Sequence, residues 1–184
     1  MDRVTRIESI TVPLSRPNID TDQILPARFL QKPRSGGFGQ YLFHDLRLKP
    51  DFVLNQPVFR DARILVAGEN FGCGSSRENA VWALHDYGFR AVIAPSMGDI
   101  FTANCLKNGL LPIILPAPVV ATILTEGQIL TVDLESQTVS FAGESHTFEI
   151  DAFVRHCLLH GIDELDYTLS RMPEIEAFEK GHLS

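Results

Sequence analysis

One glycine-rich segment holds the residues best suited to chemistry. Residues 68–80 read GENFGCGSSRENA; they follow a strand-like apolar run at 62–67 and open a helix-like run at 75–87. Glycine lets backbone N–H groups approach a ligand closely, and the N-terminus of a helix favours an anion. The segment therefore predicts an anion-binding turn.

Three common glycine-rich motifs do not match this segment. Its spacing is not GxGxxG, it has no Gly-Lys-Ser/Thr, and it is not GxSxG. A Rossmann dinucleotide site, a P-loop and a nucleophile elbow are therefore unsupported.

Ser75 has two interpretations. Ser75-x-x-Glu78 matches a capping box, in which the serine side chain accepts from the third helical N–H. Arg77 favours a functional role instead, because the dipole disfavours a cation in the first turn by ~0.3–1 kcal/mol. Arg77 and the helix end would form a cationic pocket for a carboxylate. There Ser75 could act as a base on a carbon proton if cations hold the adjacent carboxylate.

Composition and charge restrict the class of partner. The 184 residues are 45% hydrophobic and 21% charged, a balance typical of a soluble globular domain. The formal net charge of −7 argues against nucleic acid and against an anionic membrane, because both attract a basic face. The N-terminal segment has no apolar core of a signal peptide, and no apolar run approaches the ~20 residues of a membrane span. We therefore expect a cytoplasmic protein.

The cysteines predict neither disulfides nor a metal site. Cys73, Cys105 and Cys157 are far apart in the sequence and form no CxxC pair. Their odd count gives no disulfide framework, and their spacing gives no ligand set. We expect reduced, mostly buried thiols and no metal bound by this chain.

Strand-like and helix-like runs alternate through the middle of the chain. We expect strands at 4–12, 62–67, 91–94 and 110–115, and helices at 75–87, 98–108 and 118–126. This alternation predicts a parallel sheet with crossover helices. Residues 128–150 predict three short antiparallel strands, a helix is expected at 151–160, and Pro173 opens a final short helix. We interpret residues 1–184 as one α/β domain with a mainly parallel sheet plus a smaller antiparallel sheet.

Three separated motifs, in order, resemble one family. GENFGCGSSRENA and its continuation VWALHDYGFRAVIAPSMGDIFTANCLKNGLLPI are similar to the C-terminal swivelling domain of the aconitase family. The opening NIDTDQILPARFL resembles that family's first motif, and IDAFVRHCLLHGIDELDYTL resembles bacterial small subunits of 3-isopropylmalate dehydratases. The likeness covers almost the whole chain. It departs from the usual pattern at Asn79, where the family has histidine, and at Met97-Gly98, where Phe-Ala is common.

The resemblance implies a fold, an activity and a partner. The fold is a three-layer β/β/α swivelling domain, and the activity is that of a hydro-lyase. It interconverts 2-isopropylmalate and 3-isopropylmalate by dehydration and rehydration, in leucine biosynthesis. The implied partner is a large subunit that carries a [4Fe-4S] cluster, where one iron acts as a Lewis acid, so no cofactor is expected on this chain. The substrate is a small dicarboxylate, and the isolated chain could form a homo-oligomer.

The resemblance also implies roles for residues. Ser75 matches the family's catalytic base, and Arg77 matches its partner for the substrate carboxylate and oxyanion. Ser76 and Gly74 lie in the same substrate-binding turn. Asp22 aligns with an active-site aspartate that we expect to orient arginine or substrate.

A glycine- and aromatic-rich stretch, residues 31–45, is interpreted as a flexible loop that closes over the site. Arg28 and Arg34 flank its start, and either is expected to bind the distal carboxylate or to be simply solvated. Two other functions stay open. One is a related hydro-lyase subunit for citramalate/citraconate or another alkylmalate. The other is an anion-binding or regulatory domain without catalysis, which fits if Ser75 only caps its helix.

Overall fold

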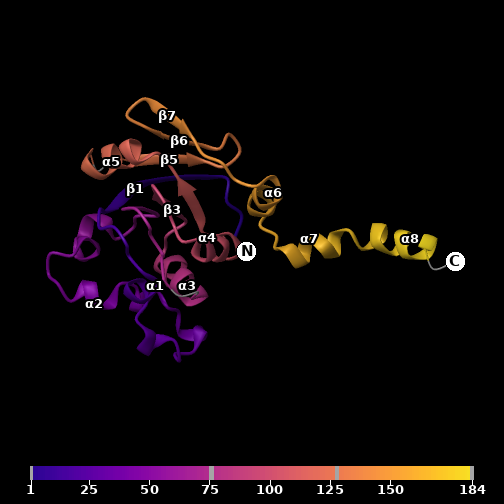
Figure 1. Cartoon of the computed structure of the whole chain (residues 1–184), viewed down its shortest axis with the longest axis horizontal. Helices are drawn as coiled ribbons and strands as arrows, with labels where there is room; N and C mark the ends of the chain where they lie inside the picture. Colours follow the sequence, from indigo (N-terminus) through magenta and orange to yellow (C-terminus); the bar gives the residue numbers. More distant parts are fainter. Residues whose placement is uncertain (1, 75–76, 127–128, 183–184) are drawn as a thin grey trace.

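The structure, a computed structural model, describes residues 2–74, 77–126 and 129–182. Figure 1 shows a rounded body with a C-terminal segment that projects from it. Ser75 and Ser76, the predicted base and its neighbour, lie outside the described residues. The site is therefore built below from the residues that surround them.

A mixed sheet with the strand order β4-β3-β2-β1-β5-β6-β7 runs through the body. Its strands are β1 (Arg6–Leu14), β2 (Ile64–Ala67), β3 (Ala91–Ala94), β4 (Leu111–Ile114), β5 (Ile129–Asp133), β6 (Thr138–Phe141) and β7 (Glu144–Thr147). Neighbouring strands are parallel from β4 to β1 and antiparallel from β1 to β7. The predicted parallel and antiparallel parts are both confirmed. They share β1, so they form one hydrogen-bonded series.

The expected helices are present, with small shifts at their ends. The helices are α1 (Thr21–Ile24), α2 (His44–Arg47), α3 (Glu78–Tyr87), α4 (Asp99–Lys107), α5 (Ala117–Glu126), α6 (Ala152–His160), α7 (Glu164–Ser170) and α8 (Met172–His182). Helix α7 was not expected from the sequence. Its signal was the pair Asp163 and Asp166, which form a capping box at the start of that helix.

The two faces of the sheet are covered by different elements. Successive strand residues point to opposite faces, so β2 and β3, which are buried throughout, contribute to both. Leu65 and Val92 pack with Leu84 of α3 in one apolar cluster. Ile64 packs in another cluster with Ile123 of α5, together with apolar residues of β5 and β6. The antiparallel strands therefore curl over the α5 side, which agrees with the expected β/β/α layers.

The segment at 31–45 is largely packed on its own domain. It forms short 3-10 turns at Arg34–Gly36 and Gly39–Tyr41 and then enters α2. Phe38 is 1% exposed, and Leu42 and Phe43 are 0% exposed. A carboxylate oxygen of Asp86 accepts from the Phe38 N–H at 2.8 Å. The aromatic half is thus part of the core, residues 31–36 are exposed, and the flexibility of the segment stays a prediction.

Candidate functional site

The predicted site residues gather at one edge of the sheet. The parallel strands β1, β2 and β3 end at Leu14, Ala67 and Ala94. Ligand sites in open α/β sheets lie outside the carboxyl ends of the strands, because the loops that follow them meet there. The loops at 15–20, 68–74 and 95–98 meet in this way.

Backbone hydrogen bonds join the first motif to the glycine-rich segment. The Gly72 N–H donates to the Ile19 carbonyl at 2.7 Å, and the Thr21 N–H donates to the Cys73 carbonyl at 3.0 Å. Asp20 and Cys73 also pair as an isolated parallel β-bridge. Two motifs that are distant in the sequence therefore lie side by side with a fixed register.

Glycine is required where these loops cross. Gly72 has φ +69, and a Cβ there would lie 2.3 Å from Cγ of Phe101. The Gly98 N–H donates to the Phe71 carbonyl at 3.0 Å, and a Cβ on Gly98 would lie 2.8 Å from the Gly72 carbonyl oxygen. Gly74, an exposed residue with φ +90, continues the turn beside Asp20. A side chain at Gly72 would collide with Phe101 of α4, and one at Gly98 would push its loop away from Gly72.

Asp22 and Arg77 form the central ion pair of the site. Arg77 Nη1 donates to Asp22 Oδ1, and the same oxygen accepts from the Ala27 N–H at 2.8 Å. The Arg77 side chain is 23% exposed and the Asp22 side chain 57% exposed, so the pair faces outward. The hydrogen bond from Arg77 holds the pKa of Asp22 below its ordinary value, although partial desolvation opposes it, and the Ala27 N–H assists.

The start of α3 differs from the predicted capping box. The N-cap is Arg77 and the first helical residue is Glu78, whereas the box would place Glu78 at the third helical position. Ser75 itself lies outside the described residues. Glu78 instead accepts from Asn108 Nδ2 at 2.9 Å and lies 3.6 Å from Lys107 Nζ. The Ser-x-x-Glu pattern matched a spacing, but tertiary contacts with the end of α4 engage the glutamate.

A second charged cluster surrounds Arg28. Its two terminal nitrogens bind both carboxylate oxygens of Asp45, one of them at 3.0 Å, and Nη2 lies 3.1 Å from His44 Nδ1. This pairing lowers the pKa of Asp45 to about 2, with a further contribution from His44. Arg28 directly follows Ala27, whose N–H donates to Asp22 Oδ1 at 2.8 Å, so the two clusters lie near each other. Asp45, in α2, was not singled out from the sequence, because no sequence pattern pairs it with a residue 17 positions away.

Arg34 lies apart from these clusters. Its guanidinium stacks over the ring of Trp82, 3.9 Å from the ring centroid, and Trp82 is in the middle of α3. The indole N–H of Trp82 donates to Asn108 Oδ1 at 2.9 Å. The structure thus brings Asp22, Arg77, Gly74 and Arg28 together, but it does not bring Arg34 to them.

Comparisons with known proteins agree along the chain. The family model for the aconitase C-terminal domain matches residues 1–118, and the LeuD_N model matches residues 121–152. The 3-isopropylmalate dehydratase small subunit of Herpetosiphon aurantiacus is 50% identical over 99% of this chain and 95% of that relative. The one from Cereibacter sphaeroides is 46% identical over 98% of this chain and 96% of that relative. The chain belongs to the family of 3-isopropylmalate dehydratase small subunits.

A solved structure confirms the fold of this small-subunit family member. The crystal structure of 3-isopropylmalate dehydratase from Methanocaldococcus jannaschii has a TM-score of 0.72 and 27% sequence identity. The match covers 95% of this chain and 99% of that one. The expected aconitase-type fold class is therefore confirmed.

The cysteines of this small-subunit chain do not fit an iron–sulfur cluster. Cys73 is half-buried, while Cys105 of α4 and Cys157 of α6 are buried, and burial raises the pKa of the Cys105 thiol well above its ordinary value. A cluster needs grouped thiolates. Within residues 2–74, 77–126 and 129–182, no three His, Cys, Asp or Glu side chains are grouped to hold a metal. In the same ranges, every helix is too short or too polar to be a candidate membrane span.

Proposed function

We propose that this chain is the small subunit of a 3-isopropylmalate dehydratase and that it acts with a large subunit. Together they would interconvert 2-isopropylmalate and 3-isopropylmalate by dehydration and rehydration, in leucine biosynthesis. The observation that carries the proposal is the Asp22–Arg77 pair, at the edge where two family motifs are hydrogen-bonded together. Identities of 46% and 50% with small subunits of this enzyme, over nearly the whole chain, support the reaction class.

Arg77 is suited to hold a substrate carboxylate. Asp22 accepts a hydrogen bond from Nη1 of the Arg77 guanidinium, and the guanidinium has other N–H donors for a bidentate contact with a substrate carboxylate. Its position as the N-cap of α3 adds the positive end of the helix dipole. Arg77 would bind the carboxylate next to the reacting carbon and stabilise the negative charge that develops on it.

Ser75 is proposed as the general base. It lies two positions before Arg77 in the chain, between Gly74 and Ser76. Its oxygen, as the alkoxide, would take the proton from the carbon next to the bound carboxylate while the hydroxyl group leaves the neighbouring carbon as hydroxide. That proton and the hydroxide together make one water, which restores the alkoxide, and rehydration adds the same proton and hydroxyl group across the double bond in the opposite sense. The [4Fe-4S] cluster, proposed on the large subunit, would supply the Lewis acid for that hydroxyl group. Backbone groups of Gly74 and Ser76 would line the substrate turn.

Arg28 is proposed to bind the second carboxylate of the substrate. Asp45 fixes its guanidinium in a bidentate contact, and Arg28 lies within electrostatic range of Asp22. Arg34 could contribute only if residues 31–37 moved it away from Trp82. This segment and the large subunit would together recognise the distal substituent of the substrate. The alternative substrate is therefore citramalate/citraconate or another alkylmalate.

Reconstitution with the native large subunit tests the proposal. The two chains are mixed anaerobically, loaded with iron and sulfide, and assayed by the ultraviolet absorbance of the unsaturated product on isopropylmalate and citramalate. We expect turnover by the pair with isopropylmalate preferred, and neither turnover nor stoichiometric iron for the lone chain. A preference for citramalate would select the alternative. An assembled, iron-loaded pair without turnover on either substrate would support the non-catalytic anion-binding domain.

A further inference from the structure

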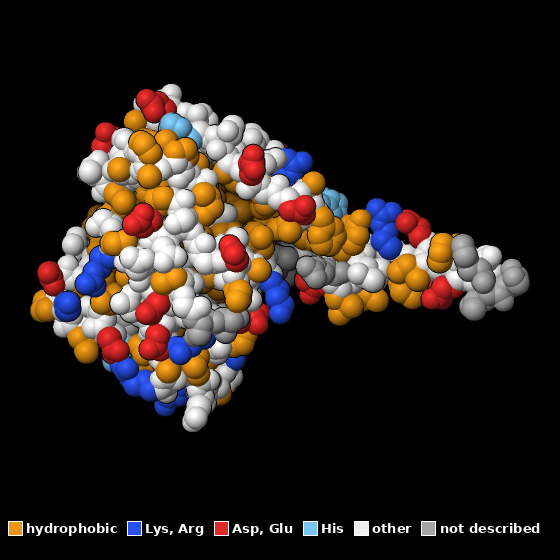
Figure 2. Space-filling model, in the orientation of Figure 1, with side chains coloured by type: hydrophobic (Ala, Val, Ile, Leu, Met, Phe, Trp, Pro, Cys, Tyr) orange, Lys and Arg blue, Asp and Glu red, His pale blue; other side chains and the backbone are white. Residues whose placement is uncertain are grey.

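The last two helices form an arm that leaves the body. Figure 1 shows α7 and α8 extending outward from α6, and Figure 2 shows hydrophobic side chains gathered where the arm leaves the body and along the arm. Leu165 is 65% exposed, Leu169 55% and Met172 39%. Leu165 and Leu169 are four positions apart, so they lie on one face of α7. Exposed apolar patches of this kind mark interaction sites.

Aromatic contacts fix the base of the arm against the body. The ring of Tyr167 packs edge-on against Phe153 of α6, with centroids 4.8 Å apart, and lies 5.8 Å from the ring of His156. Tyr167 lies between Leu165 and Leu169 in the sequence. One face of α7 is therefore anchored on α6, while the leucines are largely exposed.

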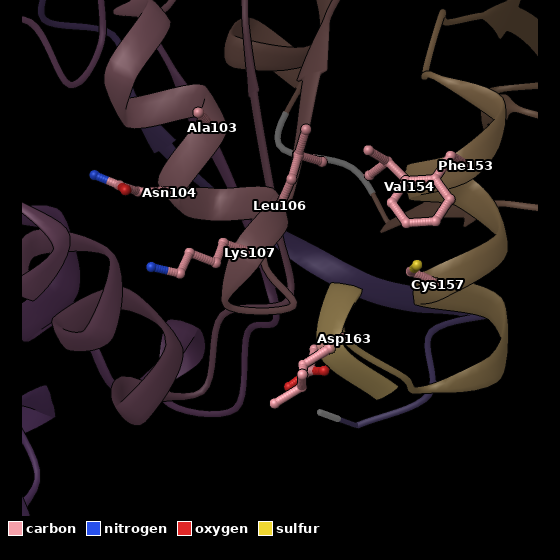
Figure 3. Close-up of a pocket in the computed structure, with 9 residues that line it drawn as sticks. Ala103, Asn104, Leu106, Lys107, Phe153, Val154, Cys157 and Asp163 are labelled. Carbon is pink, nitrogen blue, oxygen red and sulfur yellow. The ribbon is translucent and has the colours of Figure 1, made fainter. Parts of the chain in front are cut away.

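An apolar groove begins at the base of the arm. It lies between α4, α6 and the start of α7, and its volume is about 590 Å³. Figure 3 shows Leu106 of α4 and Val154 of α6 on opposite sides of it. Phe153 and Leu165 also line the groove, while Lys107 and Asp163 are charged residues on its wall. Leu165 thus belongs both to the lining of the groove and to the exposed apolar side chains of the arm.

The groove leads toward the candidate site. Ala103 and Leu106 line both this groove and a second hollow, which is bordered by Ser96, Met97 and Ile114. Ser96 belongs to the loop that is hydrogen-bonded to the glycine-rich segment, since its carbonyl accepts from the Phe71 N–H at 3.1 Å. A partner that covers the site edge can therefore extend along α4 to the arm through two adjoining hollows.

We propose that the groove and the arm form a docking surface for the large subunit. This inference rests on the proposed function, because it takes the site edge as the face that meets that subunit. The arm would reach around the partner and bury Leu165 and Leu169 against it. The surface would extend the subunit interface well beyond the reacting groups.

Charge favours the large subunit over a second copy. The exposed side of the arm carries Asp166, Glu174, Glu176 and Glu179 against Arg171 and Lys180. Two such acidic arms would repel each other, and the chain as a whole has a formal net charge of −7. The facing surface should therefore be an apolar strip bordered by Lys or Arg side chains.

A matched pair of double variants tests the proposal. Leu165→Gln with Leu169→Gln changes the arm, and Leu48→Gln with Val58→Gln changes two side chains of similar exposure, 72% and 60%, on the body. Glutamine is a good helix former, so α7 should persist, and circular dichroism checks this. The binding constant for the large subunit is measured by calorimetry with the full-length chain. Light scattering gives the mass of each chain alone.

The arm variant should bind the large subunit at least about tenfold more weakly, because two leucine side chains would lose their burial. The body variant should bind like the wild type. Affinity within twofold of the wild type in the arm variant would overturn the proposal. The proposal would also be overturned if the isolated arm variant had a lower mass than the isolated wild-type chain while its affinity for the large subunit was unchanged. A second copy of the chain would then be the occupant of the surface. Because the readout is binding, a pair that assembles without turnover counts against the proposed function alone.

Discussion

Asp22 and Arg77 are 55 positions apart in the sequence, yet they form an ion pair at the candidate site. Each residue is positioned by a different helix. Asp22 lies in α1, whose capping box joins Asp20 and Gln23, and Arg77 is the N-cap of α3. The backbone hydrogen bonds between the two motifs bring these helices together. The orientation of Arg77 thus depends on the packing of two loops and not only on its own segment.

Asp22→Asn should reduce kcat/KM by on the order of 10²-fold, because a neutral amide holds the guanidinium less firmly. The folded pKa of Asp22 is lowered, so the contribution of the pair is present above the ordinary value of 3.8 and is lost as the pH falls through the folded pKa. Between pH 6 and 8 the defect should therefore not vary with pH. Steady-state kinetics of the reconstituted pair measure it.

Asp133→Asn is the control for this variant, because the pKa of Asp133 is also lowered, by the N–H of Ser136 in a hairpin far from the site. It should leave kcat/KM unchanged. Wild-type kinetics in Asp22→Asn would mean that Arg77 needs no orienting carboxylate.

Ser75→Ala should lower kcat by about 10²–10⁴-fold and leave the fold intact. The N-cap of α3 is Arg77, so removal of the serine oxygen should not cost the ~1 kcal/mol of a lost cap. Turnover of the reconstituted pair and the thermal midpoint of the lone chain are measured together. Near wild-type turnover would refute the serine base. A large drop in the midpoint with equal loss of turnover would instead indicate a structural role.

Asp45→Asn should raise KM for the dicarboxylate more than it lowers kcat, because Arg28 would lose its bidentate partner. The pKa of Asp45 is lowered to about 2, so its stabilising contribution is present above the ordinary 3.8 and is lost as the pH falls toward 2. An NMR titration of the carboxyl group should therefore show a midpoint near 2. Asp51→Asn, at an exposed position, is the control. A midpoint near the ordinary value would show that the pair does not form in solution.

Gly72→Ala should destabilise the chain more than Gly143→Ala. Both glycines have positive φ, +69 and +83, so alanine costs each roughly 1–2 kcal/mol of backbone strain. Only at Gly72 would the new methyl group also lie 2.3 Å from the Phe101 ring, while nothing lies within 4 Å at Gly143. Urea denaturation of both variants gives the difference, which should exceed about 1 kcal/mol. Equal losses would mean that Phe101 relaxes freely.

Much of this fold follows from patterns in the sequence, because apolar runs and glycine stops mark β2, β3, α4 and the hairpin strands. Contacts between residues that are distant in the sequence were harder to predict. Asp45 carries no motif, and the buried state of Phe38 depends on a surface that α3 provides. The start of α3 was also predicted wrongly because of a distant contact: Glu78 accepts a hydrogen bond from Asn108 instead of completing a capping box. The sequence thus indicates elements and candidate residues, while their partners emerge from tertiary packing.

Residues 31–37 should exchange their amide hydrogens quickly in the free chain and slowly in the complex with large subunit and substrate. Gly36 and Gly37 raise the entropy of the free segment, and the stacking of Arg34 on Trp82 contributes only about 0.5–1 kcal/mol at an exposed site. Residues 38–43 should be protected in both samples, because Phe38, Leu42 and Phe43 are buried. The hairpin turn at 142–143 is the control and should exchange equally in both. Equal, strong protection of residues 31–37 in both samples would exclude a closing segment. Arg34 would then be a packing residue and not a ligand for the substrate.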